Sequence, residues 1–317
     1  MPVSLAAVRA AARGLEGIAV RTPIVDLPTL TARLGVPVGI KCEQLQPVGA
    51  FKIRGAYTAI SRIAREGKAR GIVTASSGNH GQAVAYSARL FGLRAVVVMP
   101  ASTPEVKVDG VRRHGGEVVF AGAVRSAEQA ARAEEIGREE GLIMVPPYDH
   151  VDVVTGQATV GLEILEQRPE VDTILSPVSG GGLLAGISVA VAALKPSVRL
   201  VGVEPEGAAK LTAALAAGEP RTLERTASIA DGLLTQSVGS FTWPILRRVV
   251  REAVRVSEAE IGEAVRFLHH EAGLRVEPSG AVTTAALLSG RLRPAGPTVA
   301  VVSGGNVDPD LFQRLAG

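Results

Sequence analysis

The chain has 317 residues, of which 46% are hydrophobic and 21% are charged. This is the composition of a globular protein and not of a disordered one, and the length allows two lobes with their own cores. The 34 Lys and Arg residues nearly balance the 31 Asp and Glu residues, and only 3% of the chain is aromatic, so the basic patches and stacking platforms of a nucleic-acid-binding protein are not expected.

The first 16 residues have the spacing of an amphipathic helix and not of a signal peptide. The longest uncharged run, 173–194, is long enough to cross a bilayer, which takes about 20 residues. However, Pro177 and three consecutive glycines at 180–182 interrupt it. We therefore expect a cytoplasmic protein without a membrane span. The single cysteine, Cys42, has no disulfide partner and is expected to be a small buried residue.

Short β-branched runs alternate with alanine-rich segments of helical period between residues 71 and 145. Helices are expected at 81–91, 104–114 and 127–140. Strands are expected at 71–75, 94–99, 117–120 and 143–145. Because a helix separates each strand from the next, these strands should form a parallel sheet.

A second alternating series begins near residue 155. Its expected strands lie at 173–175, 199–203 and 298–302. Its expected helices lie at 155–167, 183–194, 208–217, 258–271 and 281–288, with an irregular stretch between the third and the fourth. We therefore predict an α/β fold in which residues 1–66 and 146–317 form a large domain and residues 67–145 a small inserted domain.

The run Ser179-Gly180-Gly181-Gly182 lies between a predicted strand and a predicted helix. Glycines allow backbone N–H groups to close around an anion, and the helix that begins at Leu183 directs its positive end there. The run therefore predicts a phosphate site. It also fits the fingerprint of a nicotinamide dinucleotide site, with Ala185 at its third position and Glu204 after the next strand.

A lysine in an apolar setting marks a second segment. The chain has six lysines against twenty-eight arginines, and Lys52 lies between Phe51 and Ile53. Only an amine can form a Schiff base, and an apolar environment lowers the pKa of that amine. Lys52 is therefore a candidate for covalent catalysis, although this segment alone is more typical of a lysine on a helix surface.

Two further segments follow predicted strands. The run Ser76-Ser77-Gly78-Asn79-His80 combines small hydroxyls, an amide and the N–H groups of a helix start, which together can bind a carboxylate. The run Ser303-Gly304-Gly305-Asn306 follows the last strand and by itself is an ordinary loop.

These four segments together resemble the fold-type-II pyridoxal-phosphate enzymes, in particular the branch of threonine/serine dehydratases and serine racemases. The resemblance displaces the dinucleotide interpretation and implies a two-lobed, tryptophan synthase β-like architecture with parallel-rich sheets and helices on both faces. It also implies a homodimer. The matching segments occur in the family's order and are Lys41-Cys42-Glu43, the four runs above, Thr155-Gly156-Gln157, Ile229-Ala230-Asp231-Gly232, Thr242-Trp243-Pro244 and Val276-Glu277-Pro278-Ser279.

The resemblance implies a role for each matched position. Lys52 would carry pyridoxal 5'-phosphate and act as the base at the substrate Cα. Asn79 would bond the phenolic oxygen of the cofactor and Ser303 its pyridine nitrogen. The substrate carboxylate would be held by Ser76, Ser77, Asn79 and His80, with Ser77 also a catalytic acid/base. The implied cofactor contacts are Phe51, Lys52, Asn79, Ser179, Gly180, Gly181, Gly182, Leu183, Glu277, Ser303 and Gly304.

The implied reaction is β-elimination from L-threonine or L-serine, which yields a 2-keto acid and ammonia, with slow serine racemisation beside it. A serine hydroxyl facing the pyridine nitrogen leaves the ring a weaker electron sink than an aspartate would, which favours elimination. Two alternatives stay open, a β-replacement enzyme of the cysteine or threonine synthase type and a non-catalytic amino-acid sensor. Tyr148 is similar to the aromatic position of dehydratases, but 3-hydroxyaspartate remains a third candidate substrate.

The chain departs from the family pattern at several positions. Ala50 replaces the usual serine before Phe-Lys. The divalent-cation site of many relatives would use Glu204 and Ala208 here, but its aspartate position falls at Lys210, whose ammonium can neutralise Glu204. We therefore do not expect a bound cation. Because the sequence stops soon after Asn306, we also do not expect the regulatory domain of isoleucine-inhibited dehydratases.

Overall fold

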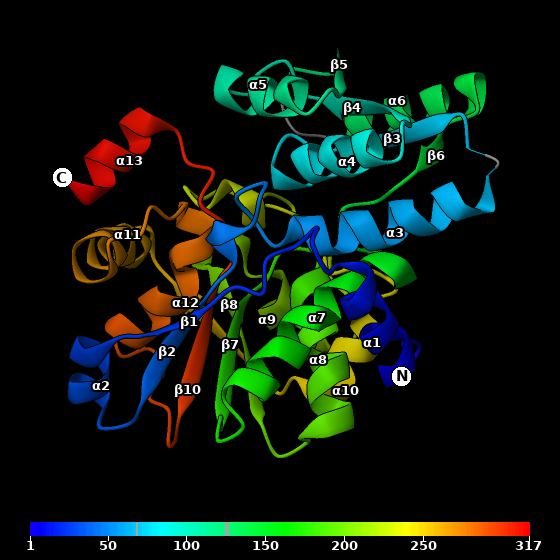
Figure 1. Cartoon of the computed structure of the whole chain (residues 1–317). Helices are drawn as coiled ribbons and strands as arrows, with labels where there is room; N and C mark the ends of the chain where they lie inside the picture. Colours follow the sequence, from blue (N-terminus) through cyan, green and yellow to red (C-terminus); the bar gives the residue numbers. More distant parts are fainter. Residues whose placement is uncertain (68, 124–126) are drawn as a thin grey trace.

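A computed structural model of the chain describes residues 1–67, 69–123 and 127–317 and contains two sheets (Figure 1). The larger sheet has six strands in the order β1-β2-β10-β7-β8-β9, and only β1 is antiparallel to its neighbour. The smaller sheet has four parallel strands in the order β5-β4-β3-β6. The predicted α/β fold with parallel-rich sheets is therefore confirmed.

The strands have the following bounds: β1 Ile24–Asp26, β2 Val38–Cys42, β3 Gly71–Ala75, β4 Arg94–Met99, β5 Glu117–Phe120, β6 Ile143–Met144, β7 Thr173–Pro177, β8 Arg199–Pro205, β9 Glu252–Val256 and β10 Thr298–Val302. The α-helices are α1 Leu5–Gly14, α2 Pro28–Leu34, α3 Lys52–Glu66, α4 Asn79–Leu90, α5 Glu105–Arg113, α6 Ala127–Glu140, α7 Val151–Gln167, α8 Gly182–Leu194, α9 Lys210–Ala217, α10 Trp243–Val249, α11 Glu258–Ala272, α12 Pro278–Leu288 and α13 Pro309–Ala316. Among the described residues, three short 3-10 helices complete the list: η1 Glu43–Leu45, η2 Glu206–Ala208 and η3 Asp231–Leu233.

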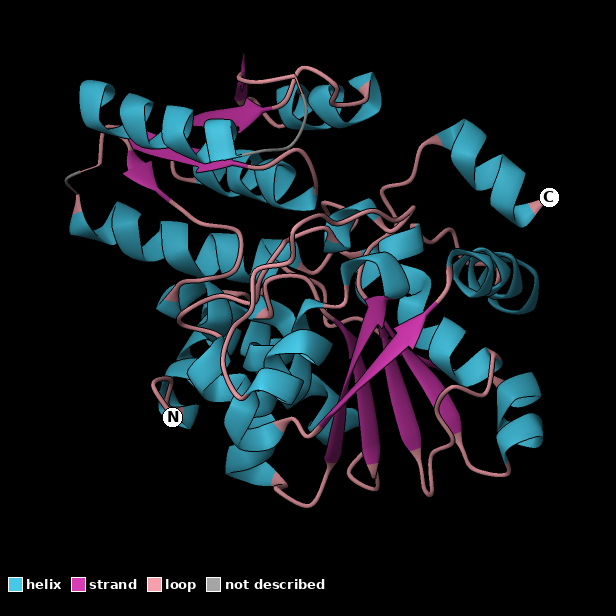
Figure 2. Cartoon of the chain, turned by 180° about the vertical axis from the view of Figure 1, so that it is seen from behind, coloured by secondary structure: helices cyan, strands magenta, loops and turns pink. Residues whose placement is uncertain are grey.

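Helices cover both faces of the six-stranded sheet (Figure 2). Strand β10 shows why, because its side chains alternate between two cores. Val299 and Val301 pack into the cluster formed with α1, α7, α8 and α10, whereas Ala300 and Val302 pack into the cluster formed with α2, α11 and α12. A strand that is apolar on both faces must be buried on both, as parallel sheets usually are.

The four-stranded sheet is covered in the same way. Val97 and Met99 of β4 pack with α5, whereas Val96 and Val98 pack with α6. Helix α4 lies on the α5 face and also contacts α3, which runs between the two sheets (Figure 1). A Cβ added to Gly156 of α7 would lie 2.3 Å from the Arg54 carbonyl oxygen of α3, so this glycine allows the two helix backbones to approach closely.

Most predicted elements are confirmed within a few residues, but the prediction of an irregular stretch after α9 was wrong. It contains α10 and β9, and β9 pairs with β8 at the edge of the large sheet. Helix α7 begins at Val151 and not near residue 155. Cys42 is buried as predicted. Within residues 1–67, 69–123 and 127–317, no helix has the length and the apolar character that a membrane span requires.

Candidate functional site

The carboxyl ends of strands from both sheets meet at one cavity of about 310 Å³. In the small sheet the strand order reverses between β3 and β6, which is the kind of position where open α/β sheets bind ligands. The cavity is lined by residues of the segments that follow strands, including Ser76 after β3, Pro147 after β6, Ser179 after β7 and Ser303 after β10. Four segments that are far apart in the sequence are thus brought together, as the predicted site requires.

The glycine run forms one wall of this cavity. Gly181 has a φ of +92°, and helix α8 begins at Gly182, so backbone N–H groups at the helix start are available to an anion. A Cβ added to Gly180 would lie 2.2 Å from the Tyr148 ring, which leaves no room for a side chain. The Thr242 hydroxyl donates to the Gly180 carbonyl at 2.8 Å and holds the loop in place. This cradle fits a phosphate group.

Lys52 begins helix α3 and lines the same cavity. Its Nζ donates to the Pro147 carbonyl at 2.7 Å and lies 5.2 Å from the centre of the Phe51 ring. The amine therefore contacts the segment that follows β6 and shares the cavity with the glycine run. Its position in the cavity fits a group that forms a covalent bond to a ligand there.

The serine-rich run forms the start of helix α4, and Ser76 to His80 all line the cavity. His80 is buried, and its Nε2 lies 3.0 Å from the Val145 carbonyl, which can only accept, so Nε2 carries the hydrogen. Burial, assisted by the charge of Lys52, lowers the pKa of His80 to about 3. The imidazole is therefore neutral, and a carboxylate in the cavity would use the backbone N–H groups of this helix start.

Asn79 and Glu277 are in direct contact within the cavity wall. Asn79 Nδ2 donates to Glu277 Oε1 at 2.7 Å. Burial, and next the charge of Asp231, raises the pKa of Glu277 to about 8. Gly304 does not line the cavity; a Cβ there would lie 2.4 Å from Glu277 Oε1. Its contribution is the space it leaves for this carboxyl group.

Glu277→Gln should make the unfolding free energy of the apo-protein less sensitive to a rise in pH. Between about pH 4.5 and 8 the Glu277 carboxyl is neutral when folded and ionised when unfolded, so unfolding releases a proton and the stability falls as pH rises. Each pH unit corresponds to about 1.4 kcal/mol. Urea titrations at pH 5 and pH 8 should therefore show a smaller loss of unfolding free energy in the variant than in the parent. Equal losses would contradict a buried neutral carboxyl.

The family's cation position lies outside the cavity lining. Glu204 and Lys210 are both fully buried, and Lys210 Nζ is 3.7 Å from Glu204 Oε1. The ammonium also donates to the carbonyls of Val178 and Leu233, at 3.2 and 2.7 Å. Ala208 is buried at the end of η2. Among the described residues no cluster of three or more His, Cys, Asp or Glu side chains could hold a metal ion.

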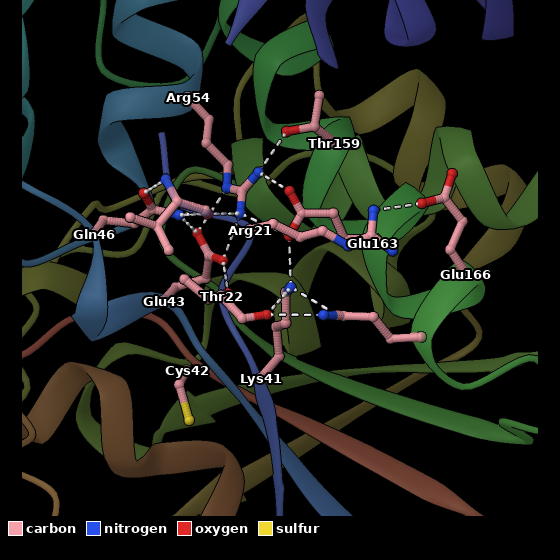
Figure 3. Close-up of polar contacts among 12 residues, drawn as sticks. Arg21, Thr22, Lys41, Cys42, Glu43, Gln46, Arg54, Thr159, Glu163 and Glu166 are labelled. Atoms are coloured by element: carbon pink, nitrogen blue, oxygen red, sulfur yellow. Dashed lines mark hydrogen bonds and ion pairs between the residues drawn. The ribbon is translucent and has the colours of Figure 1, made fainter. Parts of the chain in front are cut away.

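Sequence reasoning missed a buried network of charges beneath helix α3 (Figure 3). The Arg54 guanidinium bonds both oxygens of Glu43 and both oxygens of Glu163, at 2.6–2.9 Å. Lys41 Nζ lies 2.6 Å from Glu163 Oε2. Although burial opposes it, Arg54 holds the pKa of Glu43 below its ordinary value. The segments Lys41-Cys42-Glu43 and Lys52-Ile53-Arg54 contained the signal, since each carries charge next to apolar residues.

Comparison with known proteins agrees with this geometry. A family model described as "Pyridoxal-phosphate dependent enzyme" matches residues 15–304. The chain is 43% identical over 290 residues to an L-threonine ammonia-lyase of Geobacter sulfurreducens, covering 91% of this chain and 72% of that one. It is 40% identical over 295 residues to a serine racemase of Arabidopsis thaliana, covering 91% and 88%. The structure of maize serine racemase matches with a TM-score of 0.95 at 36% identity, covering 99% and 97%. The resemblance is confirmed: the chain belongs to the family of pyridoxal-phosphate-dependent enzymes.

Proposed function

We propose that this protein catalyses the β-elimination of water from L-threonine or L-serine and releases a 2-keto acid and ammonia. The observation that carries the proposal is the meeting of Lys52, the glycine run and the Ser76–His80 helix start in one cavity. The relatives named as a threonine ammonia-lyase and as serine racemases support it. The test is a keto-acid assay of the purified enzyme with threonine, serine and 3-hydroxyaspartate, and absence of product from all three would refute the proposal.

The residues of the cavity divide between cofactor and substrate. Lys52 would attach pyridoxal 5'-phosphate, and the N–H groups of the run from Ser179 to Leu183 would bind its phosphate. When bound, the cofactor supplies an electron sink for the electrons left at the substrate Cα. Phe51 and Ser303 line the cavity where its ring would lie. The Ser303 hydroxyl, offered to a ring nitrogen in place of a carboxylate, keeps that nitrogen largely neutral and favours loss of the β-hydroxyl.

Lys52 is the proposed base that removes the proton from the substrate Cα. Its amine can reach only one face of a bound planar ligand, so the proton cannot be returned to the opposite face by the same group. The N–H groups at the start of α4 would hold the substrate carboxylate, because a helix N-terminus favours a negative charge. The hydroxyls of Ser76 and Ser77 would complete that site.

Ser77→Ala should separate the two directions of proton transfer. We propose that Ser77 acts on the face opposite Lys52, so that slow serine racemisation accompanies elimination. The variant should lose racemisation and lose activity on D-serine by about 100-fold or more, the lower range for a positioned acid/base, while L-threonine deamination changes far less. Assays of both substrates on one preparation make the comparison. Equal losses, with a raised KM for each, would leave Ser77 as a carboxylate-binding residue only.

The proposal extends to the organisation of the protein. Residues 67–145 would form a small domain inserted into a large domain of residues 1–66 and 146–317, and two chains would associate as a homodimer in the cytoplasm. We also propose that the Lys210 ammonium neutralises Glu204 in place of a metal ion, because it already bonds two carbonyls there. Dialysis against a chelator should then leave the deamination rate unchanged.

A further inference from the structure

Three side chains form a continuous hydrogen-bonded row beside the cavity. Asn306, in the loop after β10, donates through Nδ2 to Asn79 Oδ1 at 2.8 Å. Asn79, at the start of α4, donates through its own Nδ2 to Glu277 at 2.7 Å. Asn306 Nδ2 also donates to the Val48 carbonyl at 2.8 Å. The row therefore joins the helix that follows β3 of the small sheet to three segments around the large sheet.

The direction of these bonds follows from the Val48 end. A backbone carbonyl can only accept, so Asn306 must turn its NH₂ group toward Val48. The second hydrogen of that NH₂ group then meets Asn79, which must present its carbonyl oxygen. Glu277 cannot set this direction, because a carboxyl group accepts when ionised and can donate when protonated. Asn306 therefore determines which way the Asn79 amide faces, whatever the protonation state of Glu277.

The orientation decides what Asn79 offers to a ligand. Its oxygen is engaged by Asn306 and one of its N–H bonds by Glu277. Among the described residues no protein acceptor takes the second N–H, and Asn79 lines the cavity. An N–H group stabilises an oxygen that carries negative charge, whereas an amide carbonyl in the same place would repel it.

We infer that Asn306 is a positioning residue that fixes the Asn79 amide so that it presents an N–H, and not a carbonyl, to an anionic oxygen in the cavity. The inference rests on the proposed function, in which that oxygen is the phenolic oxygen of pyridoxal phosphate. Asn306 itself does not line the cavity and acts only through Asn79.

Two glycines leave the space that the row occupies. Gly49 has a φ of +69°, and a Cβ there would lie 2.4 Å from Asn306 Oδ1. A Cβ on Gly304 would lie 3.0 Å from Asn79 Nδ2. The Gly305 N–H donates to the Gly49 carbonyl at 2.9 Å and holds the two loops together. Larger residues at either glycine would displace a member of the row.

Asn306→Asp tests the inference, since it keeps the shape of the side chain and removes both donors. The Asn79 amide should then rotate, because its NH₂ group is the better partner for the new carboxylate. We expect the affinity of the apo-enzyme for pyridoxal phosphate, measured by fluorescence titration, to fall at least tenfold, and the absorbance maximum of the bound cofactor to shift. An unchanged affinity and spectrum would overturn the inference.

Adding Glu277→Gln separates the effect of the Asn79 amide orientation on cofactor binding from an effect on the stability of the protein. In the single variant Glu277→Gln the amide oxygen of the new side chain can still accept from Asn79, so the Asn79 amide keeps its orientation and this variant is the reference for the double variant. Above about pH 8 the Glu277 carboxyl of Asn306→Asp is ionised and cannot donate to the rotated Asn79, whereas the new side-chain NH₂ of Asn306→Asp/Glu277→Gln can. The Tm measured there should therefore recover toward that of Glu277→Gln. The cofactor affinity and spectrum should remain those of Asn306→Asp. Joint recovery of Tm, affinity and spectrum would show a merely structural role.

Two further outcomes are informative. If Asn306→Asp does not fold, Asn306→Ala replaces it, because alanine leaves Asn79 free to rotate without adding a charge; a parent-like affinity and spectrum in that variant would overturn the inference. If the parent itself does not bind pyridoxal phosphate, the proposed function fails. If the parent binds pyridoxal phosphate and both Asn306 variants bind it with the same affinity and spectrum, the inference is refuted but the proposed function is not.

Discussion

Lys52→Ala should abolish deamination of hydroxyamino acids, with a loss of at least about 10⁴-fold, as expected when a group that acts in every step is removed. The variant should also lose the violet absorbance of covalently bound cofactor. The reason is chemical, since Lys52 is the only one of the described residues lining the cavity whose side chain carries an amine. Borohydride reduction of the parent followed by peptide mapping should place the pyridoxyl group on Lys52.

Lys52→Arg provides the matched control. Arginine keeps the positive charge and the contact with the Pro147 carbonyl, but a guanidinium does not form a Schiff base. Activity and absorbance should therefore be lost in both variants, while the Tm of the apo-protein with arginine stays nearer the parent value. The outcome that contradicts the assignment is a pyridoxyl group on another lysine, such as Lys41, whose amine the structure commits to Glu163.

The small sheet was predictable from the sequence because its strands are short β-branched runs between amphipathic helices. The alternation placed β4 at residues 94–99 without error. Strand β9 was missed because Glu252 and Arg255 interrupt its apolar residues, and an edge strand can carry such charges toward solvent. Only pairing with β8, which lies about fifty residues earlier, identifies this segment as a strand.

The site was predictable to the extent that its residues follow strands in recognisable runs. Their mutual contacts were not, because each depends on segments that the fold brings together. Asn306 and Asn79 are 227 residues apart, and Asn79 and Glu277 are 198 apart. The direction of a hydrogen bond between two amides also depends on a third partner, here the Val48 carbonyl. No local pattern contains that information.

The charged network beneath α3 leads to the largest expected effect on stability. The side chains of Arg54 and Glu43 are at most 1% exposed, and that of Glu163 is 13% exposed. Removing one partner from such a set leaves a buried charge without compensation, which typically costs about 3–5 kcal/mol. Arg54→Met should therefore lower the unfolding free energy of the apo-protein by about that amount, because two carboxylates lose their shared guanidinium. Urea titration with a helix-sensitive signal measures the change.

Arg62→Met is the control on the same helix. Arg62 also contacts two carboxylates, Glu66 and Asp152, but its side chain is 61% exposed, and solvent screens such pairs. Its loss should be much smaller than that of Arg54→Met, although both variants remove one arginine from α3. In Arg54→Met/Glu43→Gln, one of the two carboxylates that lose the guanidinium, the fully buried Glu43, is replaced by a neutral amide, so part of the lost stability should return. Similar losses for Arg54→Met and Arg62→Met would mean that the buried network stabilises helix α3, and with it Lys52, no more than a surface pair does.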